Sequence, residues 1–126
     1  MPALNAIGIV ASDLARSIHF YRLLGLDVPK TPNEGHVDTF LPNGVRFMLD
    51  TEDTVRSFRP DWTRETGNQL GLAFECESPA EVDDVYERVT AAGFRGEKEP
   101  WDAFWGQRYA QLLDPDGVPV DLYATL

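Results

Sequence analysis

The stretch AIGIVASDLARSIHFY, residues 6–21, and the stretch GLAFECESPAEVDDVY, residues 71–86, follow one plan. Each begins with a short apolar run, breaks at polar residues and continues with a helical pattern that closes on a tyrosine. The two stretches lie 65 positions apart (71 − 6). A short apolar run followed by a helical period is typical of a strand followed by a helix. The repeat therefore predicts one supersecondary unit present in two copies.

A second pair of segments extends each copy. LPNGVRFML, residues 41–49, matches DPDGVPVDL, residues 114–122, at an offset of 73 (117 − 44). The Pro-Asn-Gly and Pro-Asp-Gly sequences suit a type I turn followed by a left-handed glycine and a bulge. Each pair thus adds a hairpin after the helix. The order of elements becomes βαβββ followed by βαβββ.

The expected fold is therefore α+β, with two tandem βαβββ modules that form a concave cleft. We expect one domain over residues 1–126, with module one at 1–50, a crossover linker at 51–69 and module two at 70–126. The first strand is expected over 4–10. The linker is polar and is expected to hold at most one irregular turn. In each module the helix covers one face of the sheet, and the other face stays free for a ligand.

The amino-acid composition limits the kinds of molecule that the protein is expected to bind. The net charge is −10, from 11 basic and 21 acidic residues, which opposes binding to nucleic acid and to anionic membranes. The same charge favours a cationic ligand, although it also fits simple solubility. No apolar run approaches the length of a membrane span, and the first residues do not resemble a secretory signal. Cys76 is the only cysteine, is expected to be a small buried hydrophobe, and fits a cytoplasmic location.

Three longer segments carry a family resemblance. VASDLARSIHFYRLLGL (10–26), LAFECESPAEVDDVYERVTAAGF (72–94) and WGQRYAQLLDPDGVPVDLY (105–123) resemble the vicinal oxygen chelate superfamily. This superfamily includes glyoxalase I, extradiol dioxygenases, fosfomycin-resistance enzymes and bleomycin-resistance proteins. The stretch EPWDAFWGQRYAQLLDPDG (99–117) is most similar to the metal-free, drug-binding branch. The resemblance implies paired βαβββ modules and a homodimer.

The resemblance also implies where metal ligands would lie. Metal-dependent members take them from the first and last strand of each module, typically as His, Gln or Glu. The corresponding positions here are Ala6, Met48, Gly71 and Asp121. Alanine and glycine have no donor atom, a thioether is a poor ligand for these ions, and catalytic sites need about three protein ligands. We therefore expect no metal, no cofactor and no catalytic residue.

Aromatic and acidic residues are the candidates for binding a ligand. Three tryptophans fall in predicted loops or at strand edges, where flat ligands are often held, although ordinary packing explains them equally well. Carboxylates on the free faces suit a cationic group, and His36 is expected at the mouth of the cleft without a paired ligand. The predicted ligand-binding residues are His36, Asp38, Phe40, Met48, Asp50, Trp62, Trp101, Trp105, Tyr109 and Asp121. Arg46 is expected to pair with Asp50 or Asp121, and Arg108 to form a structural ion pair.

Three functions compete at this point. The first is metal-independent sequestration of a bulky, partly aromatic natural product, such as a cationic or polycyclic aromatic antibiotic, which would give antibiotic resistance. The second is a metal-dependent enzyme of the superfamily, an isomerase, lyase or dioxygenase, with its metal held by unusual residues such as His36 and Asp121. The third is a non-catalytic module that binds another protein. The lack of donor side chains at the expected metal positions, together with the tryptophans, favours sequestration.

Overall fold

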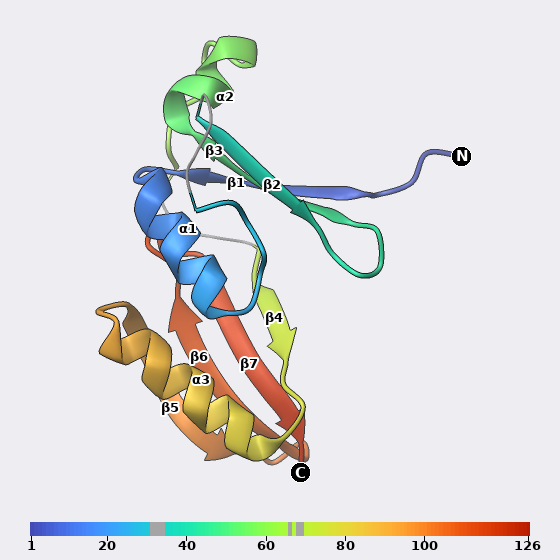
Figure 1. Ribbon diagram of the computed structural model, residues 1–126, viewed down its shortest axis with the longest axis vertical. Coiled ribbons are helices and arrows are strands. Elements are labelled where there is room, and N and C mark those ends of the chain that lie inside the picture. Colours follow the sequence, from blue (N-terminus) through green and yellow to red (C-terminus); the bar gives the residue numbers. More distant parts are fainter. Residues whose placement is uncertain (31–34, 66, 68–69) are drawn as a thin grey trace. The chain divides into compact units, whose positions relative to one another are not determined.

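The computed structural model describes residues 1–30, 35–65, 67 and 70–126. Its helices and strands confirm the predicted α+β class. The chain divides into two compact units, Met1–Glu65 and Thr66–Leu126. Each unit contains one small sheet and is described below by itself (Figure 1). The predicted cleft between the modules stays a prediction.

The first unit is built on a three-stranded sheet with the order β1-β3-β2. Its elements are β1 (Ala6–Ala11), α1 (Leu14–Leu23), β2 (His36–Phe40), β3 (Arg46–Thr51) and α2 (Glu52–Phe58). β1 runs parallel to β3, and β2 runs antiparallel to β3. β1 begins two residues later than predicted, because its partner strand β3 begins at Arg46, which pairs with Ala6. The exposed Leu4 lies outside the strand.

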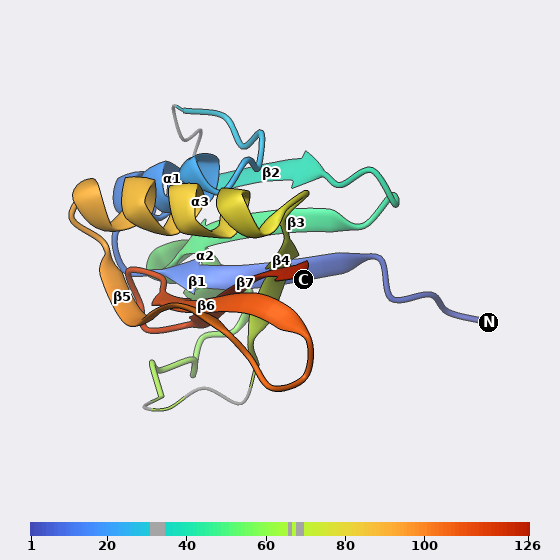
Figure 2. The same ribbon diagram turned by 90° about the horizontal axis from the view of Figure 1, so that it is seen from below.

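Helix α1 covers one face of this sheet, as Figure 2 shows. Asp13 caps its N-terminus by accepting a hydrogen bond from the backbone N–H of Arg16. The predicted stripe of Leu14, Ile18 and Tyr21 is buried. The ring of Tyr21 packs at 4.9 Å, centroid to centroid, from that of Phe47 on β3.

Helix α2 corrects the prediction for the linker, which was expected to be irregular. Thr51 caps the helix by accepting a hydrogen bond from the N–H of Thr54, and the acidic Glu52 and Asp53 occupy its first turn. Val55 is buried, and the helix contacts β1 and β3. A capped N-terminus with acidic residues and one buried side chain thus stabilise this short helix. Its 7 residues are too few to show a helical period of apolar residues. Linker residues 66, 68 and 69 lie outside the described residues.

The second unit contains a complete βαβββ module. Its elements are β4 (Leu72–Glu75), α3 (Pro79–Ala91), β5 (Arg95–Asp102), β6 (Gln107–Leu113) and β7 (Pro119–Thr125), and the sheet order is β4-β7-β6-β5. As predicted, Ser78 caps α3 and Pro79 begins it. α3 packs across β5, β6 and β7 and covers one face of this sheet (Figure 1).

The core of the second unit lies between α3 and this sheet. Its buried members are Val82, Val85 and Val89 on the helix, and Ala110, Leu112, Val120 and Leu122 on the strands. Arg108 belongs to the same side of β6 and pairs with Asp83 of α3 at 2.9 Å and with Asp102 of β5 at 3.1 Å. The predicted structural ion pair of Arg108 is therefore confirmed.

Both predicted hairpins have the expected geometry. In the first, the N–H of Gly44 donates to the carbonyl of Leu41, and in the second the N–H of Gly117 donates to that of Asp114. Both glycines adopt a positive φ, 86° and 84°, which favours glycine at these positions. A third turn of the same form joins β5 to β6, where the N–H of Gly106 donates to the carbonyl of Ala103.

Two further predictions concern the single cysteine and membrane-spanning segments. Cys76 is buried, and burial raises the pKa of its thiol to about 11, so the predicted structural role is confirmed. Among the helices of the described residues, none is long and apolar enough to cross a membrane.

Candidate functional site

Each sheet has one face that its helix leaves open, and register assigns residues to it. Directly paired residues on neighbouring strands point to the same face. The first open face comprises Ala6, Gly8, Val10, His36, Asp38, Phe40, Arg46, Met48 and Asp50. The second open face comprises Ala73, Glu75, Trp101, Tyr109, Gln111, Asp121 and Tyr123.

The predicted ligand-binding residues divide between these faces. Five of them, His36, Asp38, Phe40, Met48 and Asp50, share the first open face. Trp101, Tyr109 and Asp121 share the second, and Trp105 lies in the turn beside it. Trp62 belongs to neither. The structure therefore brings nine of the ten residues onto two surfaces, without itself testing their role.

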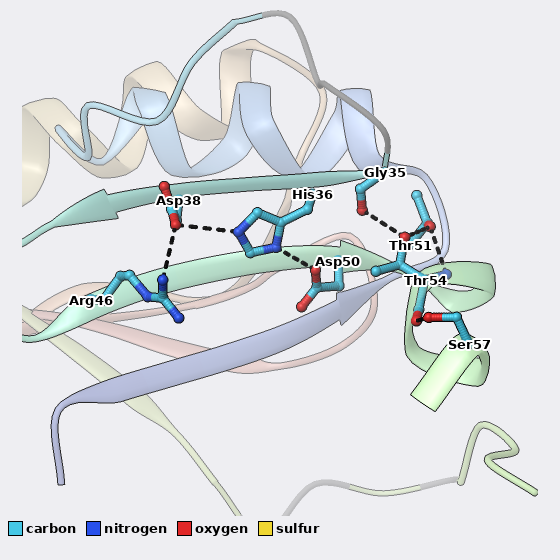
Figure 3. Close-up of polar contacts among 8 residues, drawn as sticks. All are labelled: Gly35, His36, Asp38, Arg46, Asp50, Thr51, Thr54 and Ser57. Carbon is cyan, nitrogen blue, oxygen red and sulfur yellow. Dashed lines mark hydrogen bonds and ion pairs between the residues drawn. The ribbon is translucent and has the colours of Figure 1, made fainter. Parts of the chain in front are cut away.

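His36 is the centre of the first open face (Figure 3). Its Nδ1 lies 2.5 Å from Oδ1 of Asp50, and its Nε2 lies 3.2 Å from Oδ2 of Asp38. His36 thus has two side-chain partners, which were not predicted from the sequence. The hydrogen bond to Asp50 contributes most to raising the pKa of His36 above the ordinary value of 6.5, and partial burial opposes it. The imidazole thus holds its proton more tightly than an ordinary histidine does, between two carboxylates.

Arg46 completes this cluster from β3. Its guanidinium lies 3.5 Å from Oδ2 of Asp38, the same oxygen that faces His36. Arg46 thus pairs with Asp38 rather than with the predicted Asp50, because the antiparallel register places Asp38 opposite Met48, two residues from Arg46. The alternative pairing with Asp121 stays a prediction. We call His36, Asp38, Arg46 and Asp50 the His36 cluster.

The end of β2 next to the His36 cluster is fixed by threonines (Figure 3). The N–H of Thr51 and the hydroxyl of Thr54 both donate to the carbonyl of Gly35. A side chain at Gly35 would meet the hydroxyls of Thr54 and Thr51 at 2.5 and 2.8 Å. Helix α2 therefore holds the strand that carries His36.

Aromatic rings dominate the second open face. Tyr109 lies at their centre, with ring centroids 5.4 Å from Trp101, 5.2 Å from Trp105 and 6.4 Å from Tyr123. Phe104 extends the group at 5.0 Å from Trp105. Most of these contacts are edge-to-face, the geometry that aromatic pairs prefer. We call these five residues the aromatic cluster.

Two members of the aromatic cluster remain accessible to solvent. Phe104 is 96% exposed and Trp105 is 47% exposed at the β5–β6 turn. Trp105 Nε1 donates a hydrogen bond to Oε1 of Gln107 at 2.8 Å, which fixes the indole. A fixed and half-exposed indole offers flat area for stacking with little loss of entropy.

Charged groups border the aromatic cluster. The hydroxyl of Tyr109 donates to Oδ2 of Asp121 at 2.5 Å. Burial, together with this hydrogen bond and the carboxylate charge, raises the pKa of Tyr109 to about 12, so the phenol stays protonated at physiological pH. The ammonium of Lys98 lies 3.8 Å from the centroid of Trp101, which shows that this ring accepts a cation on its face.

Trp62 has a different environment from the other two tryptophans. The guanidinium groups of Arg56 and Arg64 lie 5.3 and 5.5 Å from its ring centroid. Both arginines also pair with Glu52 of α2. These contacts fasten the segment after α2 to the helix, and they give Trp62 a packing role in the first unit.

The residues present do not fit the metal site that the family fold implies. Ala6 and Gly71 have no donor, Met48 offers only a thioether, and the one carboxylate, Asp121, accepts the hydrogen bond of Tyr109. In the described part of the chain, no group of three or more His, Cys, Asp and Glu side chains is placed to hold a metal ion.

Comparison with known proteins identifies the family. The model of the Glyoxalase/Bleomycin resistance protein/Dioxygenase superfamily matches residues 3–122. The chain belongs to this superfamily. The match confirms the predicted superfamily. It does not distinguish the drug-binding branch from the enzymes of the superfamily. No curated protein matches the chain.

Solved structures agree with this fold. A glyoxalase/bleomycin resistance protein/dioxygenase from Nocardioides is 29% identical, with a TM-score of 0.76 over 100% of this superfamily member and 85% of that chain. A glyoxalase/bleomycin resistance protein/dioxygenase family enzyme from Burkholderia phytofirmans has a TM-score of 0.85 at 17% identity, over 99% and 100% of the two chains. A glyoxalase-related enzyme from Fulvimarina pelagi has the same TM-score at 19% identity, over 99% and 89%. At these identities the last two support the fold alone.

Proposed function

We propose that this superfamily member binds and sequesters a bulky, partly aromatic natural product, such as an antitumour antibiotic, and so gives resistance without a metal ion. One observation carries the proposal. The aromatic cluster presents an exposed phenylalanine and a half-exposed, hydrogen-bonded tryptophan, and Tyr109 connects this tryptophan with the carboxylate of Asp121. Rings fixed next to a charge are what a pocket for a flat cationic ligand requires.

The donor chemistry supports binding rather than metal-assisted catalysis. Superfamily enzymes need about three protein ligands for a catalytic metal, and three of the four corresponding positions here are Ala, Met and Gly. Asp121, the remaining carboxylate, is oriented by Tyr109 on the second open face. A carboxylate fixed in this way suits the ammonium group of a ligand. The alternative function, a metal-dependent isomerase, lyase or dioxygenase, lacks this support.

Tryptophan fluorescence tests the proposal directly. A Trp62→Phe background restricts the signal to Trp101 and Trp105, both next to Tyr109. This protein is titrated with bleomycin, with an enediyne and with mitoxantrone, a cationic anthraquinone. We expect a saturable change with at least one of them in the micromolar range. If none of the three produces a saturable change up to high micromolar concentration, sequestration of such drugs is wrong.

A further inference from the structure

The first open face holds two positive charges of different kinds. The guanidinium of Arg46 is permanent, whereas the imidazole of His36 can lose its proton within the physiological range. Asp38 and Asp50 provide two negative charges opposite them. With His36 protonated the His36 cluster is neutral. Without that proton it keeps one unbalanced negative charge.

Strand β1 does not compensate for this charge, because its residues on the first open face, Ala6, Gly8 and Val10, do not titrate. Among the described residues of the sheet, the charged groups that face His36 are Asp38 on its own strand and Asp50 and Arg46 on β3. Beyond the sheet, Arg64 donates to the carbonyl of Val10, which pairs with Asp50, and its guanidinium is balanced by Glu52 of α2. Within the His36 cluster, a neutral His36 leaves Asp50 without a cationic partner, and Asp38 keeps only the contact with Arg46 at 3.5 Å.

The groups involved can be reached from solvent. The side chain of His36 is 37% exposed and that of Asp38 is 36% exposed. The side chain of Asp50 is 14% exposed, so an incoming positive group reaches Asp38 directly and Asp50 only through its smaller exposed part. An anion, in contrast, would have to displace Asp38 from both His36 and Arg46, which share its Oδ2. The net charge of −10 adds to the preference for a cation.

We propose that the His36 cluster is a proton-exchange subsite, where an ammonium or guanidinium group of a ligand takes Asp38 and Asp50 as His36 releases its proton to solvent. The inference rests on the proposed function for the natural ligand, and it specifies that this ligand is an organic cation. Binding then releases up to one proton. Affinity for a cation therefore rises with pH through the titration of His36.

The experiment follows the two histidines of the full chain by NMR of their imidazole nitrogens. The probe is benzylammonium, and benzyl alcohol is its uncharged counterpart, both at a constant ionic strength of about 0.15 M. We expect the His36 midpoint to fall by about 1 pH unit at a tenfold excess of benzylammonium over its dissociation constant. An unchanged His36 midpoint, or an equal shift with benzyl alcohol, overturns the inference.

A matched pair of variants sharpens this test. In His36→Gln, the affinity for benzylammonium becomes independent of pH between about pH 5 and 8, whereas His19→Gln retains the dependence. Retention in both variants overturns the inference.

The outcome is separable from that of the proposed function. If none of the three drugs alters Trp101 and Trp105 fluorescence but benzylammonium lowers the His36 midpoint, sequestration is wrong and the subsite stands. If a drug binds but neither the drug nor benzylammonium changes the His36 midpoint, the proton-exchange subsite is wrong and sequestration stands.

Discussion

The open faces of the two sheets use the same register positions for different chemistry. His36 pairs with Asp50 on the first sheet, and Tyr109 pairs with Tyr123 on the second, each partner 73 positions further along (109 − 36 and 123 − 50). The first pair is joined by a charged hydrogen bond, whereas the second is two stacked rings. The first face therefore suits a charge and the second a flat ring.

The sheet faces that the helices cover are, in contrast, alike in the two units. Leu49 on β3 and Leu122 on β7 are also 73 positions apart, and both are buried leucines beneath a helix. The two modules thus keep one kind of packing where the helix lies and differ where it does not. This comparison indicates that stability resides in the covered faces and function in the open ones.

The largest expected effect tests that division. Leu49→Ala and Leu122→Ala should each lower the free energy of unfolding by about 2–5 kcal/mol, because each leaves a cavity in a closed core. Their open-face neighbours, in Met48→Ala and Asp121→Asn, should cost no more than about 1 kcal/mol. Urea unfolding of the four variants measures this. Equal losses on both faces would remove the distinction.

Tyr109 gives the next largest effect. With its pKa at about 12, this phenol should remain protonated where an ordinary tyrosine, with a pKa of about 10, is mostly ionised. Asp121→Asn should lower the pKa of Tyr109 only in part, because burial is the larger cause of the shift. NMR of the tyrosine rings during alkaline titration measures both values. An ordinary midpoint for Tyr109 in the unmutated protein would contradict both its burial and its hydrogen bond to Asp121.

Trp105 tests the second open face as a ligand surface. Removal of one stacked ring costs about 0.5–1.5 kcal/mol, so Trp105→Ala should weaken binding of the drug about 2- to 12-fold. Trp62→Phe is the matched control and should leave the affinity unchanged, because its ring is packed between arginines of the first unit. Isothermal titration calorimetry avoids dependence on the removed fluorophore. A larger loss in Trp62→Phe would reverse the assignment of the two tryptophans.

The smallest effect concerns the pH dependence of stability. The raised pKa of His36 means that the folded protein binds its proton more tightly than the unfolded chain. This contribution is complete below pH 6.5 and is lost as the pH rises through the folded-state pKa. It should not exceed about 1 kcal/mol, because the ion pairs are partly exposed. His36→Gln should abolish this pH dependence in urea unfolding, whereas His19→Gln should keep it.

Much of the fold follows from local signals in the sequence. The two Pro-Asn/Asp-Gly turns specify hairpins whose glycines need a positive φ, and the offsets of 65 and 73 reappear in the strand registers. Helix α2 was missed because it spans only 7 residues and buries one valine. Its start nevertheless had a readable signal, since Thr51 precedes two acidic residues as an N-cap would.

The site was predicted less completely than the fold. The predicted turn from Leu41 to Val45 already implies that His36 faces Asp50, since pairs across an antiparallel hairpin have a constant sum (41 + 45 and 36 + 50). The pairing of His36 could therefore have been found. Three members of the aromatic cluster, Trp101, Trp105 and Tyr109, were predicted as ligand-binding residues. Their mutual contacts could not be predicted, because the β5–β6 register contains irregularities that alternation does not reveal.

The most direct test of metal-independent binding combines elemental analysis with a drug titration. Protein purified without chelators is analysed for zinc, iron, nickel and manganese, and its affinity for mitoxantrone is measured before and after EDTA treatment. The account predicts metal far below one equivalent and the same affinity in both states. Stoichiometric metal, with drug binding that is lost on chelation and restored by that metal, would contradict it.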